Sequence, residues 1–256
     1  EQDRQSGFRV IAQSATIVAN LLRVAEGGEP NLPDPRRSYP ENFLWMITGR
    51  EPSPAEVRAF DQTLIAYAEH ELPNSTFAAR VIASTLADLY GALTGAVASL
   101  KGPLHGGANE AVMEMLLEAG DEDGLERLIR EKLARKERIM GFGHRVYMRR
   151  MDPRAQLLKE TLAQLVAEKG DPEGEKLVRM CQRGEDVMRQ EKGLFPNLDY
   201  YAAPVYWVLG IPIDLYTPIF FAARTAGLVA HVVEQHAHNR LFRPRVLYTG
   251  PRGLKP

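Results

Sequence analysis

Helix-start signals are the feature of this sequence that most constrains its fold. Residues Ser53-Pro54-Ala55-Glu56 form a capping box with proline at the first helical position. Thr217 followed by Pro218 repeats the combination of a cap and a first-turn proline, and opens a helix expected to run to about Ala237. The alternation typical of strands is scarce. The sequence therefore predicts an all-α, multi-helical fold, with residues 243–250 extended because they lack a helical period.

The same reasoning predicts the remaining helices, at about residues 54–70, 76–100, 108–119, 122–138, 153–168 and 173–191. Asn74 or Ser75 would cap helix 76–100, in which Gly91 and Gly95 lie four residues apart on one face. Glycines let another helix approach closely. This face therefore predicts either a helix crossing within the chain or a subunit interface.

The bulk properties narrow the class of function. A formal net charge of −1 over 256 residues gives no reason to expect nucleic acid or an anionic membrane as a partner. Cys181 is the single cysteine, which excludes an internal disulfide or a zinc-type cysteine cluster and favours a reducing, cytoplasmic compartment. The first residues are polar and show no secretory signal. The most apolar stretch, 76–100, contains Arg80 and Asp88, so we interpret it as a buried helix rather than a membrane span.

Three short segments carry candidate chemistry. Two of them, Gly102-Pro103-Leu104-His105-Gly106-Gly107-Ala108-Asn109 and Gly141-Phe142-Gly143-His144-Arg145-Val146-Tyr147, place a histidine among glycines that let a ligand approach. The third, Phe195-Pro196-Asn197-Leu198-Asp199-Tyr200-Tyr201, adds a carboxylate in another expected break between helices. Imidazole and carboxylate can be tuned toward neutral pH for acid–base work. The alternative for each residue is a turn, a cap or a hydrogen-bonded core histidine.

Together and in this order, the three segments closely resemble the catalytic motifs of the citrate synthase family, and the similarity runs from about Phe8 to the C-terminus. The resemblance implies an all-α fold in which a small helical domain, about 105–210, is inserted into a large domain made of 1–104 and 211–256. It also implies a homodimer, which favours a subunit interface for the Gly91 and Gly95 face. Family members carry a further N-terminal portion, so this chain is expected to be a truncated form or a short relative.

The reaction implied by the resemblance joins acetyl-CoA, a co-substrate, to oxaloacetate and then hydrolyses the thioester, a step of the tricarboxylic acid cycle. Asp199 would remove a methyl proton, His105 would donate a hydrogen bond to the thioester oxygen, and His144 would polarise and protonate the ketoacid carbonyl. A pKa mismatch of about 10 units between carboxylate and methyl group would be worth ~14 kcal/mol. Stabilisation of the enolate by donors such as His105 is therefore essential to this chemistry.

The resemblance also assigns residues to binding. Arg154, Arg224 and His70 would bind the ketodiacid, with Arg243 contributed to the neighbouring subunit's site, since the planar arginine fork suits carboxylates. The alternative for Arg154 and Arg243 is a solvated surface arginine, and for Arg224 a buried salt bridge. The backbone of Ile139, Met140, Gly141, Phe142 and Gly143 would line the adenine site of coenzyme A. No metal and no permanently bound cofactor is expected.

Several interpretations stay open. Four residues, 148–151, separate the second motif from Asp152-Pro153-Arg154, where the family usually has three, and the extra residue could move Arg154. Arg149 and Arg150, which lie in this segment, could contact a phosphate of CoA. A 2-methylcitrate synthase using propionyl-CoA and a truncated, non-catalytic dimerisation or regulatory paralogue are the alternatives within the family. Outside it, a metal enzyme would use His231, Glu234 and His238, which could share one helix face.

Overall fold

The structure is a computed structural model that describes residues 2–102 and 105–253. Within these ranges it contains helices and no β-strand, which confirms the predicted all-α class. The helices are α1 (Gln2–Ala25), α2 (Tyr39–Thr48), α3 (Pro54–Ala68), α4 (Asn74–Ala83), α5 (Leu89–Leu100), α6 (Ala108–Ala119), α7 (Glu122–Ala134), α8 (Pro153–Lys169), α9 (Pro172–Lys192), α10 (Leu198–Val208) and α11 (Tyr216–Ala237), with a short 3₁₀ helix at Ile213–Leu215.

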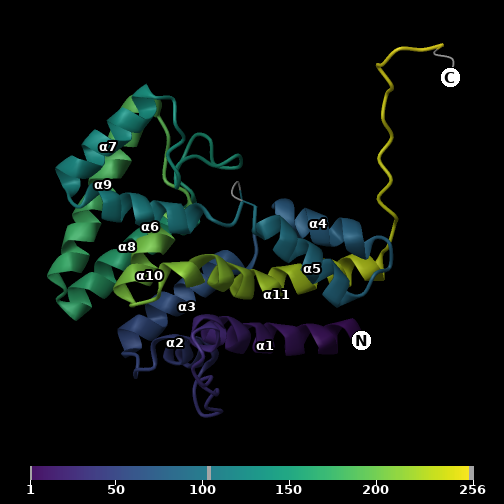
Figure 1. Ribbon diagram of the computed structural model, residues 1–256, viewed down its shortest axis with the longest axis horizontal. Coiled ribbons are helices and arrows are strands. Elements are labelled where there is room, and N and C mark those ends of the chain that lie inside the picture. Colours follow the sequence, from purple (N-terminus) through teal and green to yellow (C-terminus); the bar gives the residue numbers. More distant parts are fainter. Residues whose placement is uncertain (1, 103–104, 254–256) are drawn as a thin grey trace.

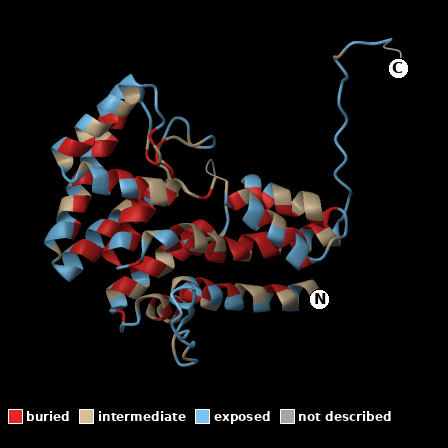
Figure 2. Cartoon of the chain, viewed as in Figure 1, coloured by how far each residue is buried: buried red, intermediate tan, exposed pale blue. Residues whose placement is uncertain are grey.

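The helices form two groups (Figure 1). On one side, α10 packs on α6 and α8, and α7 packs on α9. On the other side, α4 packs on α5, both pack on α11, and α1 lies along α11. Helix α3 contacts α8, α10 and α11 and so joins the two groups. Figure 2 shows that α10 and α11 are largely buried, whereas the segment after α11 extends away from the body and is exposed.

Aromatic side chains hold α2, α3 and α10 together. The ring centroids of Phe43 and Phe60 lie 5.3 Å apart, those of Phe60 and Tyr206 lie 6.3 Å apart, and those of Tyr206 and Tyr216 lie 5.1 Å apart, all edge to face. All four side chains are fully buried. Truncating such a ring to alanine typically costs about 3–5 kcal/mol. This chain of rings fixes the helices that carry residues of the cleft described below.

Several predicted helices are confirmed. Helix α3 begins with the predicted capping box: Ser53 Oγ accepts from the Glu56 amide at 3.2 Å, and Glu56 Oε2 accepts from the Ser53 amide at 2.9 Å. Helices α6, α8 and α9 match their predicted ranges to within one residue. Residues 243–250 carry no helix, as expected. Helices α1, α2 and α10 have no predicted counterpart.

The single helix predicted over 76–100 is wrong. The chain forms two helices there, α4 and α5, because Leu86 adopts a left-handed conformation (φ 66°) and Asp88 caps α5 by accepting from the Gly91 amide at 2.8 Å. Gly95 then faces α4, where a Cβ would lie only 2.0 Å from Ile82 Cδ1. Gly95 therefore serves a helix crossing within the chain, which is the first of the two expected roles.

Two predicted caps and one helix end also differ. Helix α4 begins at Asn74 with Pro73 as its N-cap, so neither Asn74 nor Ser75 caps it. Helix α11 begins before Thr217, whose hydroxyl donates instead to the Gly106 carbonyl at 3.0 Å. Helix α7 ends at Ala134 rather than near residue 138, because Lys136 adopts a left-handed conformation (φ 61°).

By length and composition, helix α1 could cross a membrane. No other helix in the described ranges meets this criterion. The core helix of a globular protein passes the same test. In this structure Ala15, Val18 and Ala19 of α1 are buried in the core, and α1 packs on α11 and α2. Only 28% of this apolar stretch is buried, and large apolar side chains on the rest of the helix, including Phe8, Ile17 and Val24, are exposed.

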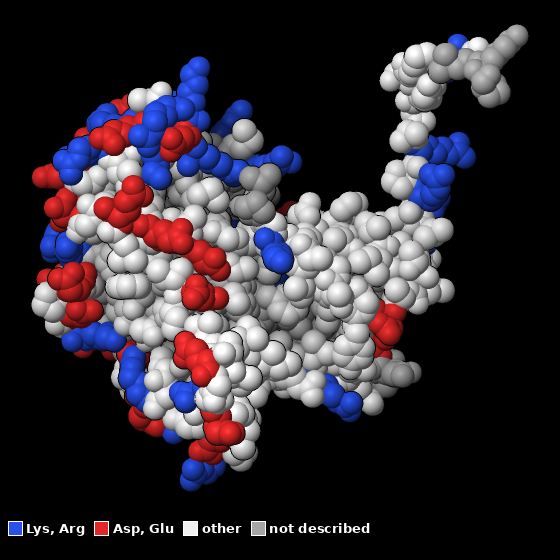
Figure 3. Space-filling view, in the orientation of Figure 1, with Lys and Arg blue, Asp and Glu red and all other residues white. Residues whose placement is uncertain are grey.

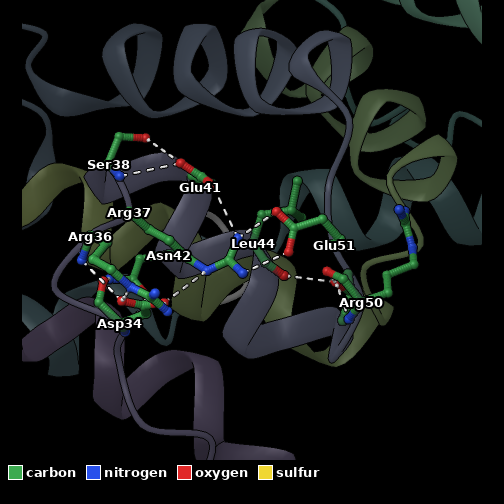
Figure 4. Close-up of polar contacts among 10 residues, drawn as sticks. Asp34, Arg36, Arg37, Ser38, Glu41, Asn42, Leu44, Arg50 and Glu51 are labelled. Atoms are coloured by element: carbon green, nitrogen blue, oxygen red, sulfur yellow. Dashed lines mark hydrogen bonds and ion pairs between the residues drawn. The ribbon is translucent and has the colours of Figure 1, made fainter.

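An ion-pair cluster fixes the segment between α1 and α2 (Figure 4); we call it the Arg37 cluster and define it as Asp34, Arg36, Arg37, Glu41 and Glu51. The Arg37 guanidinium donates to Glu51 at 2.7 and 2.6 Å and to Glu41 at 3.0 Å. Arg36 binds Asp34 through two side-chain contacts of 3.0 and 2.7 Å. The neighbouring Arg36 guanidinium lowers the pKa of Asp34 to about 2. Each carboxylate in this cluster therefore has an arginine partner.

Candidate active site

A cleft of about 690 Å³ collects the residues predicted from the sequence motifs. Every predicted site residue except Arg243 lines it: His70, His105, Ile139, Met140, Gly141, Phe142, Gly143, His144, Arg154, Asp199 and Arg224. Pro103 and Leu104 of the first motif lie outside the described residues. Tertiary structure thus brings together side chains that the sequence separates by up to 154 positions, from His70 to Arg224.

The second and third motifs lie side by side because their loops pair through the backbone. Phe142 and Pro196 form an antiparallel bridge, the Gly143 amide donates to the Phe195 carbonyl at 2.9 Å, and the Asn197 amide donates to the Gly141 carbonyl at 2.9 Å. Gly141 has a φ of 83°, and a Cβ there would lie 2.7 Å from Val112 Cγ2. The glycine is therefore required both by conformation and by space.

Asp199 lies in the first turn of α10, not in the helix break that the sequence predicted. Asn197 caps this helix: its Oδ1 accepts from the Asp199 amide at 3.1 Å. Asp199 Oδ1 accepts a hydrogen bond from the Tyr67 hydroxyl at 2.6 Å. Burial raises the pKa of Asp199 despite the Tyr67 bond and the charges of Arg154 and Arg224. A carboxylate with a raised pKa is a stronger base than one in water.

His105 is held by Ser75 of α4. The Ser75 amide donates to His105 Nε2 at 3.3 Å, and the Ser75 hydroxyl contacts the same nitrogen at 2.8 Å. Because Nε2 accepts, a neutral ring carries its proton on Nδ1. Burial, together with the charge of Arg224, lowers the pKa of His105. His105 is therefore a neutral hydrogen-bond donor at neutral pH.

His144 is oriented in the opposite sense. Its Nδ1 accepts from the Val146 amide at 3.1 Å, so a neutral ring carries its proton on Nε2. Burial and the charge of Arg154 lower its pKa. The His70 ring lies edge-on to His144, with centroids 5.1 Å apart, and its Nε2 contacts the Tyr147 hydroxyl at 2.9 Å. Burial also lowers the pKa of His70, so the cleft holds three neutral imidazoles.

Arg224 is buried in α11 with part of its guanidinium unpartnered. Its Nε donates to the Tyr67 carbonyl at 2.6 Å, and the guanidinium lies 4.8 Å from the Phe220 ring centroid. One terminal nitrogen, Nη1, is buried without a hydrogen-bond partner. Burial lowers the pKa of Arg224 to about 10, which leaves it charged at neutral pH. Among the described residues no carboxylate forms a salt bridge with it, so the buried ion pair considered from sequence is absent there.

Arg154 is not a solvated surface residue. It binds Asp152 through Nη2 at 2.7 Å and Nε at 3.1 Å, and the Asp152 side chain is fully buried while capping α8. The extra residue in segment 148–151 leaves Arg154 at the cleft. Arg149 and Arg150 are exposed and lie outside the cleft lining.

Arg243 does not join this cleft within one chain. It lies in the exposed segment after α11, and its Nη1 donates to the Pro244 carbonyl at 3.0 Å.

The geometry does not support the metal-site alternative. The Arg80 guanidinium contacts both His231 and Glu234, and His231 also contacts Glu69 at 3.1 Å. A protein cation therefore occupies the position between two of the proposed ligands.

Residues that were given no site role from the sequence hold the cleft residues in place. Tyr67 and Ser75 contact Asp199 and His105, Tyr147 contacts His70, and Asp152 holds Arg154. Asn109 also reaches Tyr67, at 3.4 Å. Asn109 and Tyr147 stood within the motifs and could have been found there. Tyr67 gave only the signal of an apolar helix position.

The chain is similar to known proteins over almost its whole length. The sequence profile described as "Citrate synthase, C-terminal domain" matches residues 1–245. The chain is 62% identical to citrate synthase of Heyndrickxia coagulans and 61% identical to citrate/2-methylcitrate synthase of Bacillus subtilis, over 97% and 98% of its length. It spans 66% of the length of each of these relatives.

Solved structures give the same result. The fold superposes with a TM-score of 0.90 and 38% identity on citrate synthase from Thermoplasma acidophilum, solved as a ternary complex with carboxymethyl coenzyme A and oxaloacetate. The match covers 99% of this chain and 68% of that one. Citrate synthase from Pyrobaculum aerophilum matches with a TM-score of 0.87 and 40% identity, over 99% of this chain and 63% of the other.

Proposed function

The chain belongs to the citrate synthase family, and on that premise we propose that it carries the catalytic cleft of an enzyme that condenses acetyl-CoA with oxaloacetate and hydrolyses the thioester. The observation that carries this proposal is the assembly of His105, His144 and Asp199 in one cleft with the unpartnered Arg224 guanidinium. A non-catalytic paralogue has no need of this arrangement, which favours the enzyme.

In the first step Asp199 takes a proton from the methyl group of acetyl-CoA. The Nδ1–H of His105 donates to the thioester oxygen, where negative charge develops, and so stabilises the enol or enolate. A neutral imidazole suits this role because it still has one N–H donor, and burial disfavours its charged form. One such donor is typically worth 10²- to 10³-fold in rate.

In the second step the enol carbon attacks the ketone carbon of oxaloacetate. The Nε2–H of His144 polarises the ketone oxygen and gives it a proton as the carbon–carbon bond forms. The product of this step is a citryl thioester. Water then attacks the thioester carbonyl, and the carbon–sulfur bond breaks to release citrate and the free thiol of coenzyme A.

Cationic and polar groups around the cleft bind the ketodiacid. Arg224 would bind one carboxylate through its free Nη1, and Arg154 would bind the other by sharing its guanidinium with Asp152. His70 would donate a further hydrogen bond after leaving Tyr147. The backbone of 139–143 would receive the adenine of coenzyme A, with Gly141 and Gly143 offering no side chain to obstruct it.

We propose the division into domains on the same grounds. Tyr67, His70 and Arg224 come from the segments assigned to the large domain, 1–104 and 211–256. His105, His144 and Asp199 come from the segment assigned to the small domain, 105–210. The cleft would then lie between the two domains.

We also propose a homodimer in which each chain supplies Arg243 to the other's cleft. Two observations support it. Large apolar side chains on α4 and α5 are exposed, including Phe77, Tyr90 and Val97, and this part of the molecule carries few charges in Figure 3. Arg243 lies on an exposed, extended segment that reaches away from its own body.

Release of thiol by the purified protein tests the activity. Acetyl-CoA and oxaloacetate should release thiol only when both are present, and Asp199→Asn should slow the release by about 10²- to 10⁴-fold. Release with acetyl-CoA alone would indicate a simple thioesterase and overturn the proposal. Because the Bacillus subtilis relative is named for both citrate and 2-methylcitrate, propionyl-CoA is assayed in parallel, with acetyl-CoA expected to give the larger kcat/KM.

Mixing two inactive variants tests the dimer. In a mixture of Asp199→Asn and Arg243→Ala chains, a mixed dimer has one cleft with an intact Asp199 and an Arg243 from its partner. Activity should therefore reappear on mixing. No recovery from a mixture shown to contain mixed dimers would place Arg243 outside the partner's site.

A further inference from the structure

Tyr67 makes the hydrogen bond that most directly affects Asp199. It lies in the last turn of α3, is almost completely buried, and donates to Asp199 Oδ1 at 2.6 Å. This distance lies in the short range typical of a hydroxyl bound to a charged carboxylate. The bond occupies one carboxylate oxygen and leaves Oδ2 for substrate.

Asn109 fixes the direction of this hydrogen bond. Its Oδ1 accepts from the Glu110 amide at 2.8 Å, so its amino group points the other way. That amino group donates to the Tyr67 hydroxyl at 3.4 Å, a long contact. A hydroxyl that accepts from Asn109 directs its own proton to Asp199. The asparagine of the first motif therefore acts on Asp199 through Tyr67.

The backbone of Tyr67 holds a second part of the cleft. Its carbonyl accepts from Arg224 Nε at 2.6 Å. One residue thus contacts the carboxylate with its side chain and the guanidinium with its main chain. A substitution of the side chain removes the first contact and leaves the second in place.

We propose that Tyr67, oriented by Asn109, is a positioning residue that presents Oδ2 of Asp199 to the methyl group of the acyl thioester. This inference rests on the function proposed above. The hydrogen bond also opposes the effect of burial on the pKa of Asp199, which keeps more of the carboxylate ionised at neutral pH. Tyr67 itself exchanges no proton with substrate.

Tyr67→Phe removes the hydroxyl alone and tests the proposal. We expect kcat to fall on the order of 10- to 100-fold, as for loss of a hydrogen bond to a charged group. The KM for oxaloacetate should change little, because the Tyr67 carbonyl still binds Arg224. The acid limb of the kcat/KM profile should move to higher pH. The primary isotope effect with methyl-deuterated acetyl-CoA should rise.

Tyr201→Phe is the matched control. Tyr201 is equally buried and also donates to a carboxylate, Glu185 Oε2 at 2.7 Å, but it does not line the cleft. Its substitution should leave the acid limb and the isotope effect unchanged. Asn109→Leu, which frees the Tyr67 hydroxyl to turn, should move the acid limb in the same direction as Tyr67→Phe but by less.

Titration of the Asp199 carboxyl carbon gives a measurement independent of turnover. The signal is assigned in ¹³C-aspartate-labelled protein by its absence from Asp199→Asn, and is then followed against pH in the wild type and in Tyr67→Phe. A higher pKa in Tyr67→Phe supports the proposal, and an equal pKa overturns it. Absence of condensation in the wild type would instead overturn the proposed function.

Discussion

The Arg37 cluster and the cleft contain the same kinds of side chain but differ in how completely the charges are paired. In the Arg37 cluster each carboxylate faces an arginine, and Asp34 and Glu51 have lowered pKa values because of Arg36 and Arg37. In the cleft, burial raises the pKa of Asp199, and the Arg224 guanidinium pairs with no carboxylate among the described residues. Arg37 Nε also lacks a hydrogen bond, but the rest of that guanidinium is paired with Glu41 and Glu51.

The two arrangements contribute to the free energy of folding with opposite sign. Paired charges near water stabilise the fold slightly and need no further ligand. Buried, incompletely paired groups cost folding free energy, which a bound ligand recovers by completing their hydrogen bonds. Unpaired polarity in a cleft therefore marks binding and catalysis, whereas paired polarity on the surface marks local structure. The following predictions test this distinction, in order of expected effect.

Asp199→Asn should have the largest effect on activity. Loss of a general base typically lowers kcat by 10²- to 10⁴-fold. The unfolding temperature at pH 7 should not fall. The raised pKa of Asp199 means that the folded state disfavours the negative charge, and asparagine removes that charge. Thiol release and calorimetry check both parts. A drop in unfolding temperature large enough to explain the inactivity would contradict the distinction.

Arg224→Met should lower kcat/KM for oxaloacetate by roughly 30-fold or more, as truncation of a buried charge partner costs ~2 kcal/mol or above. The loss should appear mainly in KM. Stability should change little, because removal of a desolvated charge offsets the lost bond to the Tyr67 carbonyl. Arg224→Lys, which keeps the charge but not the planar fork, should recover only part of the affinity. Full recovery would show that charge alone suffices.

The histidines predict a pH dependence of stability. The folded-state pKa values of His105 and His144 lie below the ordinary value, so the unfolded chain binds protons more readily. Stability should therefore fall as pH decreases below about 6.5, down to the lowered folded-state values. In the His105→Gln, His144→Gln double variant this fall should be smaller. Denaturant titrations between pH 7.5 and 5 measure it, and identical slopes in variant and wild type would contradict the assignment.

Glu51→Gln should have the smallest effect. It removes the Arg37 partner at 2.6 Å from an exposed position, so the unfolding temperature should fall slightly at low salt and not at high salt. The kinetic constants should be unchanged. A salt-independent loss of stability, or altered kinetics, would mean that the Arg37 cluster influences the cleft.

The sequence by itself determined the features that depend on neighbouring residues. The capping box at Ser53 and the extents of α6, α8 and α9 follow from backbone rules acting over three or four positions. The motifs also identified His105, His144 and Asp199, which line one cleft. The prediction of a single helix over 76–100 was wrong because the apolar pattern continues through the turn at Leu86. The left-handed conformation of Leu86 leaves no clear signal in the sequence.

Only the tertiary structure decided how the cleft residues are held. Tyr67 and Asp199 are 132 residues apart, and Ser75 and His105 are 30 apart, so no local pattern links them. The tautomer of His105 follows from the Ser75 amide, 30 residues away, whereas that of His144 follows from the Val146 amide, only two residues along the chain. Arg224 Nη1 likewise has no partner because the fold places no hydrogen-bond acceptor of the described residues next to it. Hydrogen-bond partners are set by packing, and packing is a property of the whole chain.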